Sequence, residues 1–537
     1  MKIISVLGFL VILFTNVLIA SPGDSVGMTA WDIQANGGCE KRIYVDDLLQ
    51  VHVIWTKIPF PFSSMFQRRI EYNMRFADGT WLGEQDATPY TTGYGSLDMT
   101  RIPPQRVIIS FYYYNYPCID IAGDIYYAPY NNWLWPIVTC ANNDNIVMVT
   151  DDNGSSFHHV VVTTDYGNTW SNPFSTDSTP CISQYVISTN YPGSNKVVFV
   201  ETRFITDSAA LGQLDNNIWF RLSADGGVTW GPHTNVTHYQ PSDSVRAFCN
   251  VSALFDSNDK LHIVWAGRRV QNGNYYDASK IFHWDEVHNQ ITVVSQSTGI
   301  FDGGWWGWTN PHWYGAWRMP ADQPQMTVDY STGVLYCFWC GQNDTTDYSL
   351  AGWPNGDIYG AQSTDGGLTW GMWTNLTNTH TPGALPGECE DEDYITVNPF
   401  VVNDSIYLSY IEDKDAGAIT QTEGDTTNNI VRVWIFHKNL LNIQESNTAK
   451  PPAYTFKLNP NPTRSCTEVQ YFLSAAGMVN IRLYGVDGRL IRTIEQGNKP
   501  AGSHRVQVDT RALAGGTYFV VLETPGKRIS EKIVVLK

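Results

Sequence analysis

The chain has 537 residues, 43% of them hydrophobic, and its 34 Lys and Arg against 52 Asp and Glu give a formal charge of −18. This length allows two to four domains with packed cores. Only 16% of the residues are charged, which excludes a disordered acidic chain, and the excess of carboxylates argues against a nucleic-acid-binding protein. With 44 Gly, 27 Pro, 20 Trp and 29 Tyr, the composition favours strands joined by tight turns.

The first twenty residues have the pattern of a secretory signal peptide, because Lys2 precedes an apolar run from Ile3 to Ala20. The alternative is a membrane anchor, for which the run is about at the lower length limit. We predict cleavage and export. The nine Cys are odd in number and irregularly spaced, so no disulfide framework can be assigned. Cys337 and Cys340 lie in a strand-like run, where positions three apart point to opposite faces, which favours buried thiols over a shared zinc ion.

One unit recurs between residues 21 and 447: a short apolar run, a second run, a connection, and a third run that ends in a Gly-rich turn. Seven such pairs of second and third runs indicate a β-propeller, because radial repetition buries each small sheet between two neighbours. Six blades are the alternative if the weak pair near Arg106 is something else. The second runs begin at Leu48, Arg106, Asn145, Lys196, Lys260, Gly333 and Ser405, and their partners include GDIYYAP from Gly123 and GDIYGAQS from Gly356.

Three third runs lead into a sharper motif: TTDYGNTW (163–170), SADGGVTW (223–230) and STDGGLTW (363–370). The Asp can cap the turn amides, Gly supplies a positive φ, and Trp packs between sheets. This part of the sequence resembles the Asp-box, or BNR repeat, propellers that include the sialidases. In that family the box lies away from the ligand face, so the resemblance implies structural roles for Asp165, Asp225 and Asp365.

The composition changes after Asn447. Residues 451–537 hold twelve Lys and Arg against six Asp and Glu, so the rest of the chain carries the whole negative excess. We predict a linker at 448–455 and a small Ig-like β-sandwich at 456–537. NPNP (459–462), YGVDG (484–488), GTY (516–518) and KIVVLK (532–537) resemble the type A sorting domain of type IX secretion. The resemblance implies recognition by outer-membrane secretion machinery and release or attachment at the cell surface; an ordinary accessory sandwich is the alternative.

The long insertions are expected on one face of the propeller, between second and third runs and in the crossings between blades. They are 204–216, 270–279, 342–355 and 413–428, with crossings at 295–323 and 373–392. A rigid scaffold with one face of long loops favours a binding site there. The crossing at 301–320 is rich in aromatic residues, which stack on sugars or plug the propeller. Its ligand-binding candidates are Trp305, Trp306, Trp308, Trp313, Trp317 and Arg318.

A second candidate is the acidic run GECEDEDY, in which Glu390, Asp391 and Asp393 are possible metal ligands. The run lacks the spacing of an EF-hand loop, and a solvated acidic crossing is the alternative. No cofactor is required by this interpretation, and Ca²⁺ is left as an optional ligand.

The fourth unit resembles the first blade of sialidases, in which Glu-x-Arg ends the second strand and an acid/base Asp follows. By position, Glu201 and Arg203 would line the pocket, with Asp207 or Asp215 as the proton donor. Sialidases also use three Arg on the substrate carboxylate and a Tyr–Glu nucleophile pair. The match is incomplete, because no Arg precedes the first strand of this unit. The residues that would complete a sialidase site are Arg246, Arg268 or Arg269, Arg318, Tyr410 and Glu412.

The sequence therefore predicts an exported, secreted or surface-attached propeller that binds an extracellular ligand, with a glycan or glycoprotein preferred. A sialidase-like exo-glycoside hydrolase and a non-catalytic surface structural protein are the alternatives. The enzyme would bring at least three guanidinium groups into one central pocket beside a carboxyl and a Tyr. A structural protein would fill the central opening of the propeller with its own loops.

Overall fold

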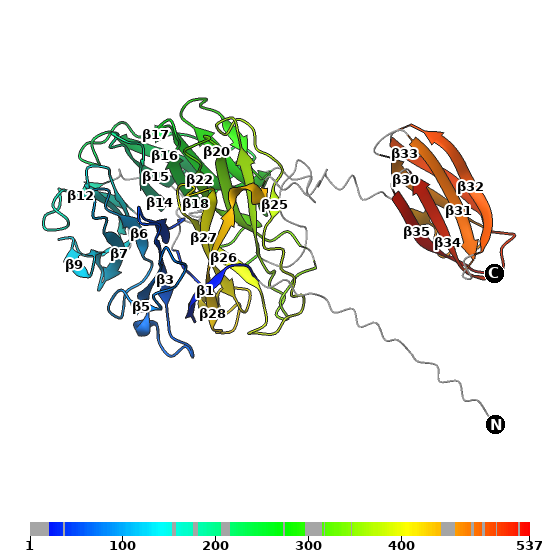
Figure 1. Ribbon diagram of the computed structural model, residues 1–537, viewed down its shortest axis with the longest axis horizontal. Coiled ribbons are helices and arrows are strands. Elements are labelled where there is room, and N and C mark those ends of the chain that lie inside the picture. The colour runs from blue at the N-terminus through cyan, green and yellow to red at the C-terminus, as the bar shows by residue number, and fades with distance from the viewer. Residues whose placement is uncertain are drawn as a thin grey trace, which may run out of the picture. The chain divides into compact units, whose positions relative to one another are not determined.

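The computed structural model describes residues 21–35, 38–152, 157–175, 181–205, 215–271, 274–295, 314–315, 317–344, 346–441, 457–473, 477–485, 489–500, 502–524 and 527–537. The chain forms two compact units, Met1–Asn442 and Ile443–Lys537 (Figure 1). Within the described ranges the secondary structure is strand, apart from short 3₁₀ turns such as η1 (Met65–Gln67) and η3 (Ile419–Gln421). The predicted signal peptide and linker lie outside these ranges.

The first unit contains seven groups of four strands among its described residues. The first three are β2 (Ile43–Val45), β3 (Val51–Lys57), β4 (Arg69–Arg75) and β5 (Gln85–Asp86); β6 (Ser96–Met99), β7 (Val107–Tyr113), β8 (Tyr116–Ile121) and β9 (Asp124–Tyr127); β10 (Trp133–Cys140), β11 (Ile146–Asp152), β12 (His158–Thr163) and β13 (Phe174–Ser175). Each group is an antiparallel meander in chain order.

The next two groups form one eight-stranded sheet, because Asn216 pairs with Ala247 at their junction. They are β14 (Cys181–Ser188), β15 (Val197–Phe204), β16 (Asn216–Ser223) and β17 (Thr234–Asn235), then β18 (Val245–Phe255), β19 (Leu261–Gln271), β20 (Asn274–Asp285) and β21 (Ile291–Val293). The sixth contains β22 (Ala321–Val328), β23 (Leu335–Gly341), β24 (Asp357–Ser363) and β25 (Thr374–Asn375).

The seventh group joins the two ends of the propeller. It contains β26 (Asp391–Val397), β27 (Ser405–Asp413) and β28 (Asn429–His437), and its outer strand is β1 (Asp24–Thr29) from the start of the unit. The inner strands β2, β6, β10, β14, β18, β22 and β26 each contact the next, and β26 contacts β2. The groups therefore follow one another around a common centre, with β1 beside β28 (Figure 1). This is the β-propeller architecture expected from the repeats.

The predicted second runs are all strands, but two details of the repeat were wrong. In the second group the partner of β7 is β8, and GDIYYAP supplies the outer strand β9 instead. The bulky YYYNYP sequence conceals a tight turn, so two strands look like one. The expected insertion at 270–279 is also wrong, because β19 and β20 extend the hairpin and pair out to Gln271 and Asn274.

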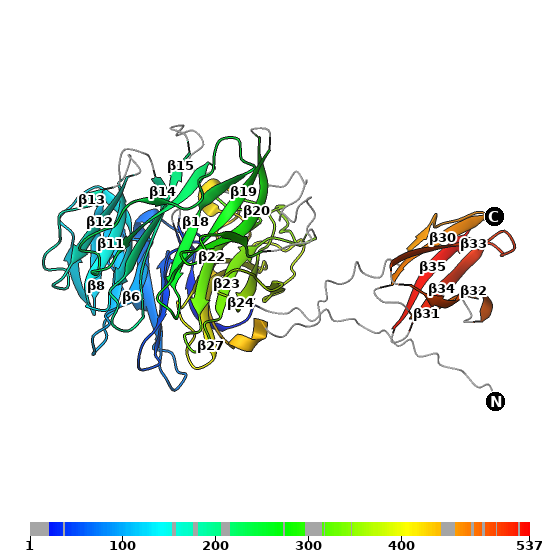
Figure 2. The same ribbon diagram turned by 90° about the horizontal axis from the view of Figure 1, so that it is seen from above.

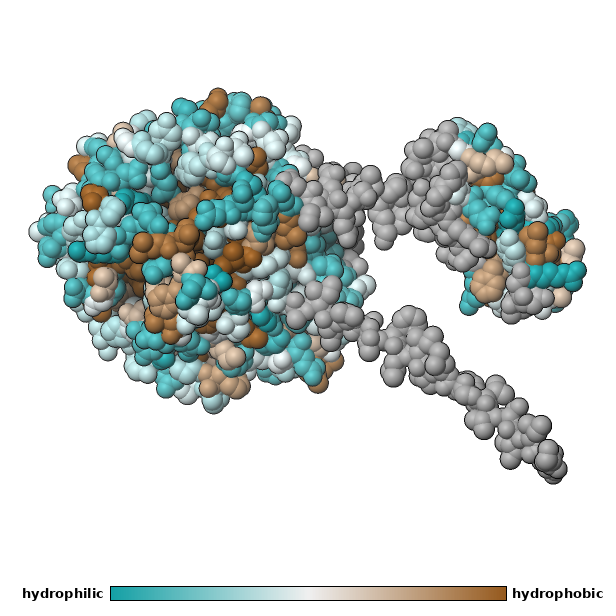
Figure 3. Space-filling view, in the orientation of Figure 1, coloured by the Kyte–Doolittle hydropathy of each residue, from teal (hydrophilic) through white to brown (hydrophobic). Residues whose placement is uncertain are grey.

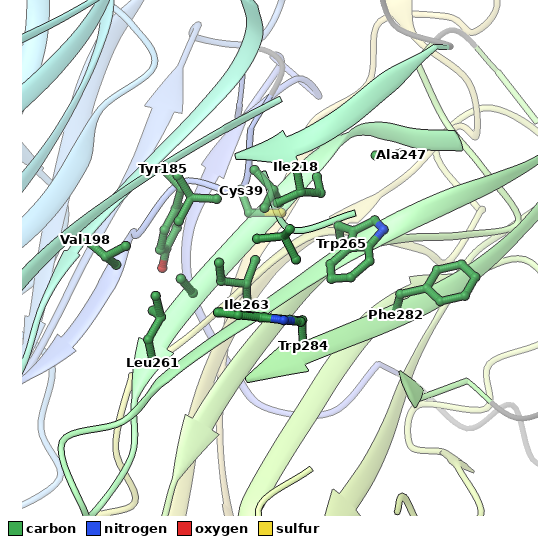
Figure 4. Close-up of a cluster of buried hydrophobic side chains, with 14 of the residues drawn as sticks. Cys39, Tyr185, Val198, Ile218, Ala247, Leu261, Ile263, Trp265, Phe282 and Trp284 are labelled. Carbon is green, nitrogen blue, oxygen red and sulfur yellow. The ribbon is translucent and has the colours of Figure 1, made fainter. Parts of the chain in front are cut away.

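The hydrophobic core lies between neighbouring groups, where apolar side chains of facing sheets interlock. Between the fourth and fifth groups, Tyr185, Ile218, Trp265 and Trp284 belong to one buried cluster (Figure 4). Cys39 reaches the same cluster from the segment that connects β1 to β2. Burial of this kind is the dominant stabilising term, at about 25 cal/mol per Å² of apolar surface.

Residues 38–42, here called the axial segment, cross the centre of the ring before β2. The side-chain amide of Gln325 on β22 donates to the Glu40 carbonyl (3.1 Å), and the Leu97 amide on β6 donates to the Lys41 carbonyl (2.7 Å). The Arg42 amide donates to Thr396 on β26. A Cβ atom on Gly38 would lie 2.7 Å from the Gln184 carbonyl of β14. The protein's own backbone thus occupies the axis between four inner strands.

The second unit is the small β-sandwich predicted from its turns (Figure 2). One sheet contains β29 (Lys457–Asn459), β30 (Cys466–Leu473) and β33 (Gly502–Asp509). The other, in the order β32-β31-β34-β35, contains β31 (Gly477–Gly485), β32 (Leu490–Lys499), β34 (Gly516–Thr524) and β35 (Lys527–Val535). Val469, Ile481, Val520 and Ile533 are among its buried core residues.

The described part of the chain contains no helix long and apolar enough to cross a membrane. Eight Cys are free thiols there, and seven of them are buried. Cys337 and Cys340 are both buried, and they pack into different hydrophobic clusters on opposite faces of β23, as predicted.

Candidate functional site

The two faces of the propeller differ in construction. We call the face that carries the connections from second to third strands and the crossings between groups the upper face, and the other the lower face. Five inner strands, β10, β14, β18, β22 and β26, have a register shift near their upper ends. Bulges of this kind re-aim side chains and are common beside functional sites.

The lower face carries the three Asp-box turns, and they have one shared set of hydrogen bonds. Asp365 accepts from the Thr369 amide (2.9 Å) and from its hydroxyl (2.5 Å), while Ser363 donates to Asp365 and accepts from the Gly367 amide. Asp165 and Asp225 are bound in the same way. These Asp side chains are thus committed to turn structure, as predicted.

The upper face holds nearly all of the exposed aromatic side chains. Ten Phe, Tyr and Trp residues are strongly exposed within the described ranges, and nine of them lie at upper-face positions, with Tyr191 on the lower face. On the face seen in Figure 3, hydrophobic residues gather towards the middle of the propeller. Seven of the nine exposed upper-face aromatic residues come from the first two groups. Six of them, at the β3–β4, β5–β6 and β7–β8 connections, are called the aromatic rim: Phe60, Phe62, Phe66, Tyr90, Tyr114 and Tyr116.

The rim residues come from three neighbouring connections that bond to each other. Thr91 donates to the Phe66 carbonyl, and Arg68, beside the same loop, donates to the hydroxyl of Tyr112 on β7. Arg68 also lies over the ring of Tyr94, 4.8 Å from its centroid. Sequence reasoning missed the rim, although the apolar run PFPFSSMF between two strand patterns was a signal for it.

Four of the predicted aromatic candidates, Trp305, Trp306, Trp308 and Trp313, lie outside the described residues, as does Asp207. Trp317 is described and is 43% exposed on the upper face. Its neighbour Arg318 is buried, so these adjacent candidates face different environments.

Arg318 joins the predicted ligand site to the predicted acidic run. Its Nη1 atom binds Asp391 at 2.9 Å and its Nη2 atom binds Asp393. Asp391 also accepts from the Gly356 amide (2.6 Å). Because the crossing before β22 and the start of β26 both lie on the upper face, residues 73 positions apart in the sequence form one ion-paired cluster.

Three further buried carboxyls surround this cluster, and sequence reasoning missed all of them. Burial raises the pKa of Asp322 to about 7 and that of Asp32 to about 6, against hydrogen bonds that favour the ionised forms. Burial, with the nearby charges of Asp32 and Asp391, raises the pKa of Asp413. Asp322 accepts from the Asn250 side chain (2.5 Å), and Asp32 accepts from the Ile419 amide (2.8 Å).

Beside Arg318 lies a small recess, in which the space available to the centre of a water-sized sphere is about 10 Å³, room for about one water molecule. It is lined by Arg318, Met319, Asp322, Gln323, Cys340, Gln342, Gly356 and Asp393. The Gln342 Oε1 atom is buried and accepts no hydrogen bond from the described residues. Several hydrogen-bond acceptors therefore line the recess, beside apolar groups such as Met319.

The metal hypothesis gains no geometric support from the described residues, since no three His, Cys, Asp or Glu side chains there are arranged to hold a metal ion. Asp391 and Asp393 are engaged by Arg318. Glu390 is half-buried, and burial raises its pKa. Calcium binding by this run stays a prediction.

The sialidase-like candidates of the fourth and fifth groups lie in separate contacts. Glu201 is fully buried with His158 (2.9 Å) and His233 (2.7 Å), and although burial opposes it, these hydrogen bonds hold the pKa of Glu201 at about 2. Arg203 donates to His233 and lies over the Trp219 ring. Asp215 binds Arg246 at 2.6 Å instead, and Arg246 also donates to the Pro241 carbonyl.

The remaining candidates also have local partners. Arg268 binds Asp277 (2.5 Å), and Arg269 donates to Gln271. The Tyr410 hydroxyl donates to the Pro22 carbonyl, while Glu412 binds Arg432 (2.5 Å) and Lys414 (2.8 Å). Arg246 and Arg268 lie opposite each other in the pairing of β18 with β19, but their side chains bind different carboxylates, Asp215 and Asp277.

Residues 457–536 match the family model of the secretion system C-terminal sorting domain. The prediction for this domain is confirmed, and it indicates export by type IX secretion to the cell surface or the extracellular space. No curated protein sequence matches the chain significantly.

Solved structures similar to this chain include a polysaccharide lyase, with 9% identity, 78% of this chain and 100% of that chain covered, and a TM-score of 0.45. An α-L-arabinofuranosidase from Fusarium graminearum has 10% identity, coverage of 76% and 98%, and a TM-score of 0.37. A Hadza microbial sialidase has 10% identity, coverage of 79% and 98%, and a TM-score of 0.28. Similarity at this level carries no argument about the activity of this chain.

Proposed function

We propose that the exported propeller binds an extracellular glycan on its upper face, without being specialised for sialic acid. The supporting observation is the placement of nine of the ten exposed aromatic side chains on this one face. Exposed apolar patches of this kind mark interaction sites, and a flat aromatic ring stacks well against the CH-rich face of a sugar. The polar recess beside Arg318 supplies hydrogen-bonding groups near the centre of the same face.

The test is binding of the purified protein to a panel of insoluble and soluble polysaccharides. Tyr114→Ala and Phe66→Ala remove the two most exposed aromatic rings of the rim. Each is expected to weaken binding by about two- to tenfold, since an aromatic contact contributes about 0.5–1.5 kcal/mol. Tyr191→Ala is the matched control, because it removes an exposed ring from the lower face.

The proposal requires that rim variants lose affinity while the control keeps it. Equal loss in all three variants, or no binding to any polysaccharide, contradicts it. The second of these results would favour a structural surface protein, for which the axial segment is the supporting observation because it already fills the centre of the ring.

The sialidase-like hydrolase remains the enzymatic alternative. It predicts turnover of a fluorogenic sialoside that is abolished by Asp215→Asn and by Arg203→Ala. We rank it lower because Asp215 and Arg246 are paired with each other while Arg203 lies against His233 and Trp219. Turnover that disappears in both variants would replace the binding proposal with this one.

A further inference from the structure

The recess beside Arg318 presents more hydrogen-bond acceptors than donors. Asp322 and Asp393 line it, and both are almost completely buried, at 3% and 4% exposure. Gln342, at 5% exposure, also lines the recess, and its buried Oε1 atom accepts no hydrogen bond from the described residues. Buried acceptors without donors are costly, by about 1–3 kcal/mol each. Asp322 already accepts from Asn250 and Asp393 binds Arg318, so the Gln342 Oε1 atom is the acceptor that a donor on an occupant would satisfy.

The positive charge of Arg318 is already committed. Both of its terminal nitrogens bind carboxylates, Asp391 and Asp393, and this pairing raises the pKa of the guanidinium group further. Arg42 is a second buried guanidinium group at the centre; it donates to the main-chain oxygens of Gln34 and Tyr394, and Glu40 is its nearby countercharge. Neither guanidinium group is thus left over for an anionic ligand.

Carboxyl groups outnumber guanidinium groups around the recess. Six carboxyls lie near the guanidinium groups of Arg318 and Arg42. In a buried setting with low dielectric, this excess repels an added carboxylate and attracts an ammonium group. The carboxyls are Asp32, Glu40, Asp322, Asp391, Asp393 and Asp413.

An exposed aromatic residue, Trp317, precedes Arg318 in the chain. Trp317 is 43% exposed, whereas its neighbour Arg318 reaches inward to the two carboxylates. Trp317 has a left-handed backbone (φ 59°), which a bulky residue adopts at a cost.

We propose that this recess is a subsite for an uncharged or amino sugar, whose hydroxyl or ammonium group donates to Asp322, Asp393 and Gln342, and that it rejects sugars carrying a carboxylate. This inference rests on the proposed glycan binding and names its ligand class. It separates the protein from receptors of sialic or uronic acids, which need an unengaged Arg.

The test uses three β-1,4-linked oligosaccharides with one backbone: oligomers of glucosamine, glucose and glucuronate, titrated by calorimetry against the full-length purified protein at pH 7. The expected order of affinity is glucosamine, then glucose, with glucuronate at least tenfold weaker than glucose. Raising the salt concentration is expected to reduce the advantage of glucosamine, since charge–charge attraction is screened.

Two variants probe the recess without touching its ion pairs. Gln342→Glu adds a carboxylate and is expected to strengthen glucosamine binding about tenfold, while Gln342→Leu removes the acceptor and weakens it by a similar factor. Asn258→Asp makes the same charge change on the lower face and is expected to leave all three affinities unchanged. Thermal unfolding of each variant shows whether the fold is retained.

The outcomes separate this inference from the function beneath it. Glucuronate binding as tight as glucose, or a Gln342→Glu variant that behaves like Asn258→Asp, overturns the subsite while glycan binding stands. If none of the three oligomers binds while polysaccharides of the panel do bind, that result also contradicts the subsite. If no polysaccharide of the panel binds, the proposed glycan-binding function itself is contradicted.

Discussion

The lower and upper faces of the propeller use their carboxylates in opposite ways. On the lower face, Asp165, Asp225 and Asp365 each bond to the turn that follows. Burial raises the pKa of each carboxyl, but the hydrogen bonds together outweigh it and lower the pKa. On the upper face, burial raises the pKa of Asp322 and Asp32. On the lower face, hydrogen bonds within the turn satisfy the carboxylates. On the upper face, burial makes the ionised form of the carboxyls costly, so a bound cation or a proton stabilises them.

This difference shows where the fold is stabilised and where it is specialised. A repeated turn with satisfied hydrogen bonds stabilises the sheets at three places without any ligand. A cluster of buried carboxyls around one Arg costs desolvation free energy, and proteins keep such clusters most often at functional sites. The predictions that follow test whether the two faces divide stability and binding in this way.

The largest effect is expected from Arg318→Leu. Asp391 and Asp393 would remain buried without their cation, and removal of one partner from a buried ion pair costs about 3–5 kcal/mol. Denaturant unfolding of the propeller measures this change. Arg268→Leu is the control, because its partner Asp277 is 40% exposed and such a pair contributes less than about 1 kcal/mol. Equal losses would mean that the upper cluster is no more coupled than the surface.

The stability of the propeller is expected to fall as the pH rises, because the pKa of buried carboxyls such as that of Asp322 is raised in the folded state. Folded Asp322, with its pKa near 7, keeps a proton that the unfolded chain loses near pH 4. Its stabilising contribution is therefore complete below about pH 4 and is lost as the pH rises through 7. Urea unfolding between pH 4 and 8 should show this decline, and Asp322→Asn should flatten it.

Asp277→Asn, at an exposed pair, is the control for this measurement and should leave the slope unchanged. A decline of equal steepness in the protein and in Asp322→Asn would show that other groups set the pH dependence.

A smaller effect is expected from Asp365→Ala on the lower face. The variant loses two hydrogen bonds to Thr369, and a capping side chain of this kind contributes about 1 kcal/mol. Unfolding should detect the loss, while the affinity for any bound polysaccharide should stay the same. Weakened polysaccharide binding in a folded Asp365→Ala protein would contradict the assignment of stability to the lower face and of binding to the upper face.

Local patterns were sufficient to predict the propeller, the Asp-box turns and the sorting domain. Each depends on residues close together in the chain: alternating apolar runs, a Ser/Thr-x-Asp turn with Gly, and the ordered motifs of residues 459–537. Hydrophobic periodicity and turn chemistry act over a few residues, so they can be recognised without coordinates. The misplaced strand β9 came from a turn that lacks Gly and Pro at its two central residues, Tyr114 and Asn115.

The upper site could not be assembled from the sequence. Arg318 and the acidic run were predicted as separate candidates. Asp32 was not predicted as a site residue, because it lies in a short segment only three residues after the N-terminal strand. Asp32, Arg318 and Asp413 come close enough to interact electrostatically only when the ring closes. Closure depends on the pairing of β1 with β28 and on the axial segment that crosses the centre. The sequence determined which strands and turns form, because those are local free energies. The tertiary structure alone decided which charges meet, because contacts between residues hundreds of positions apart depend on where the closed ring places each strand end.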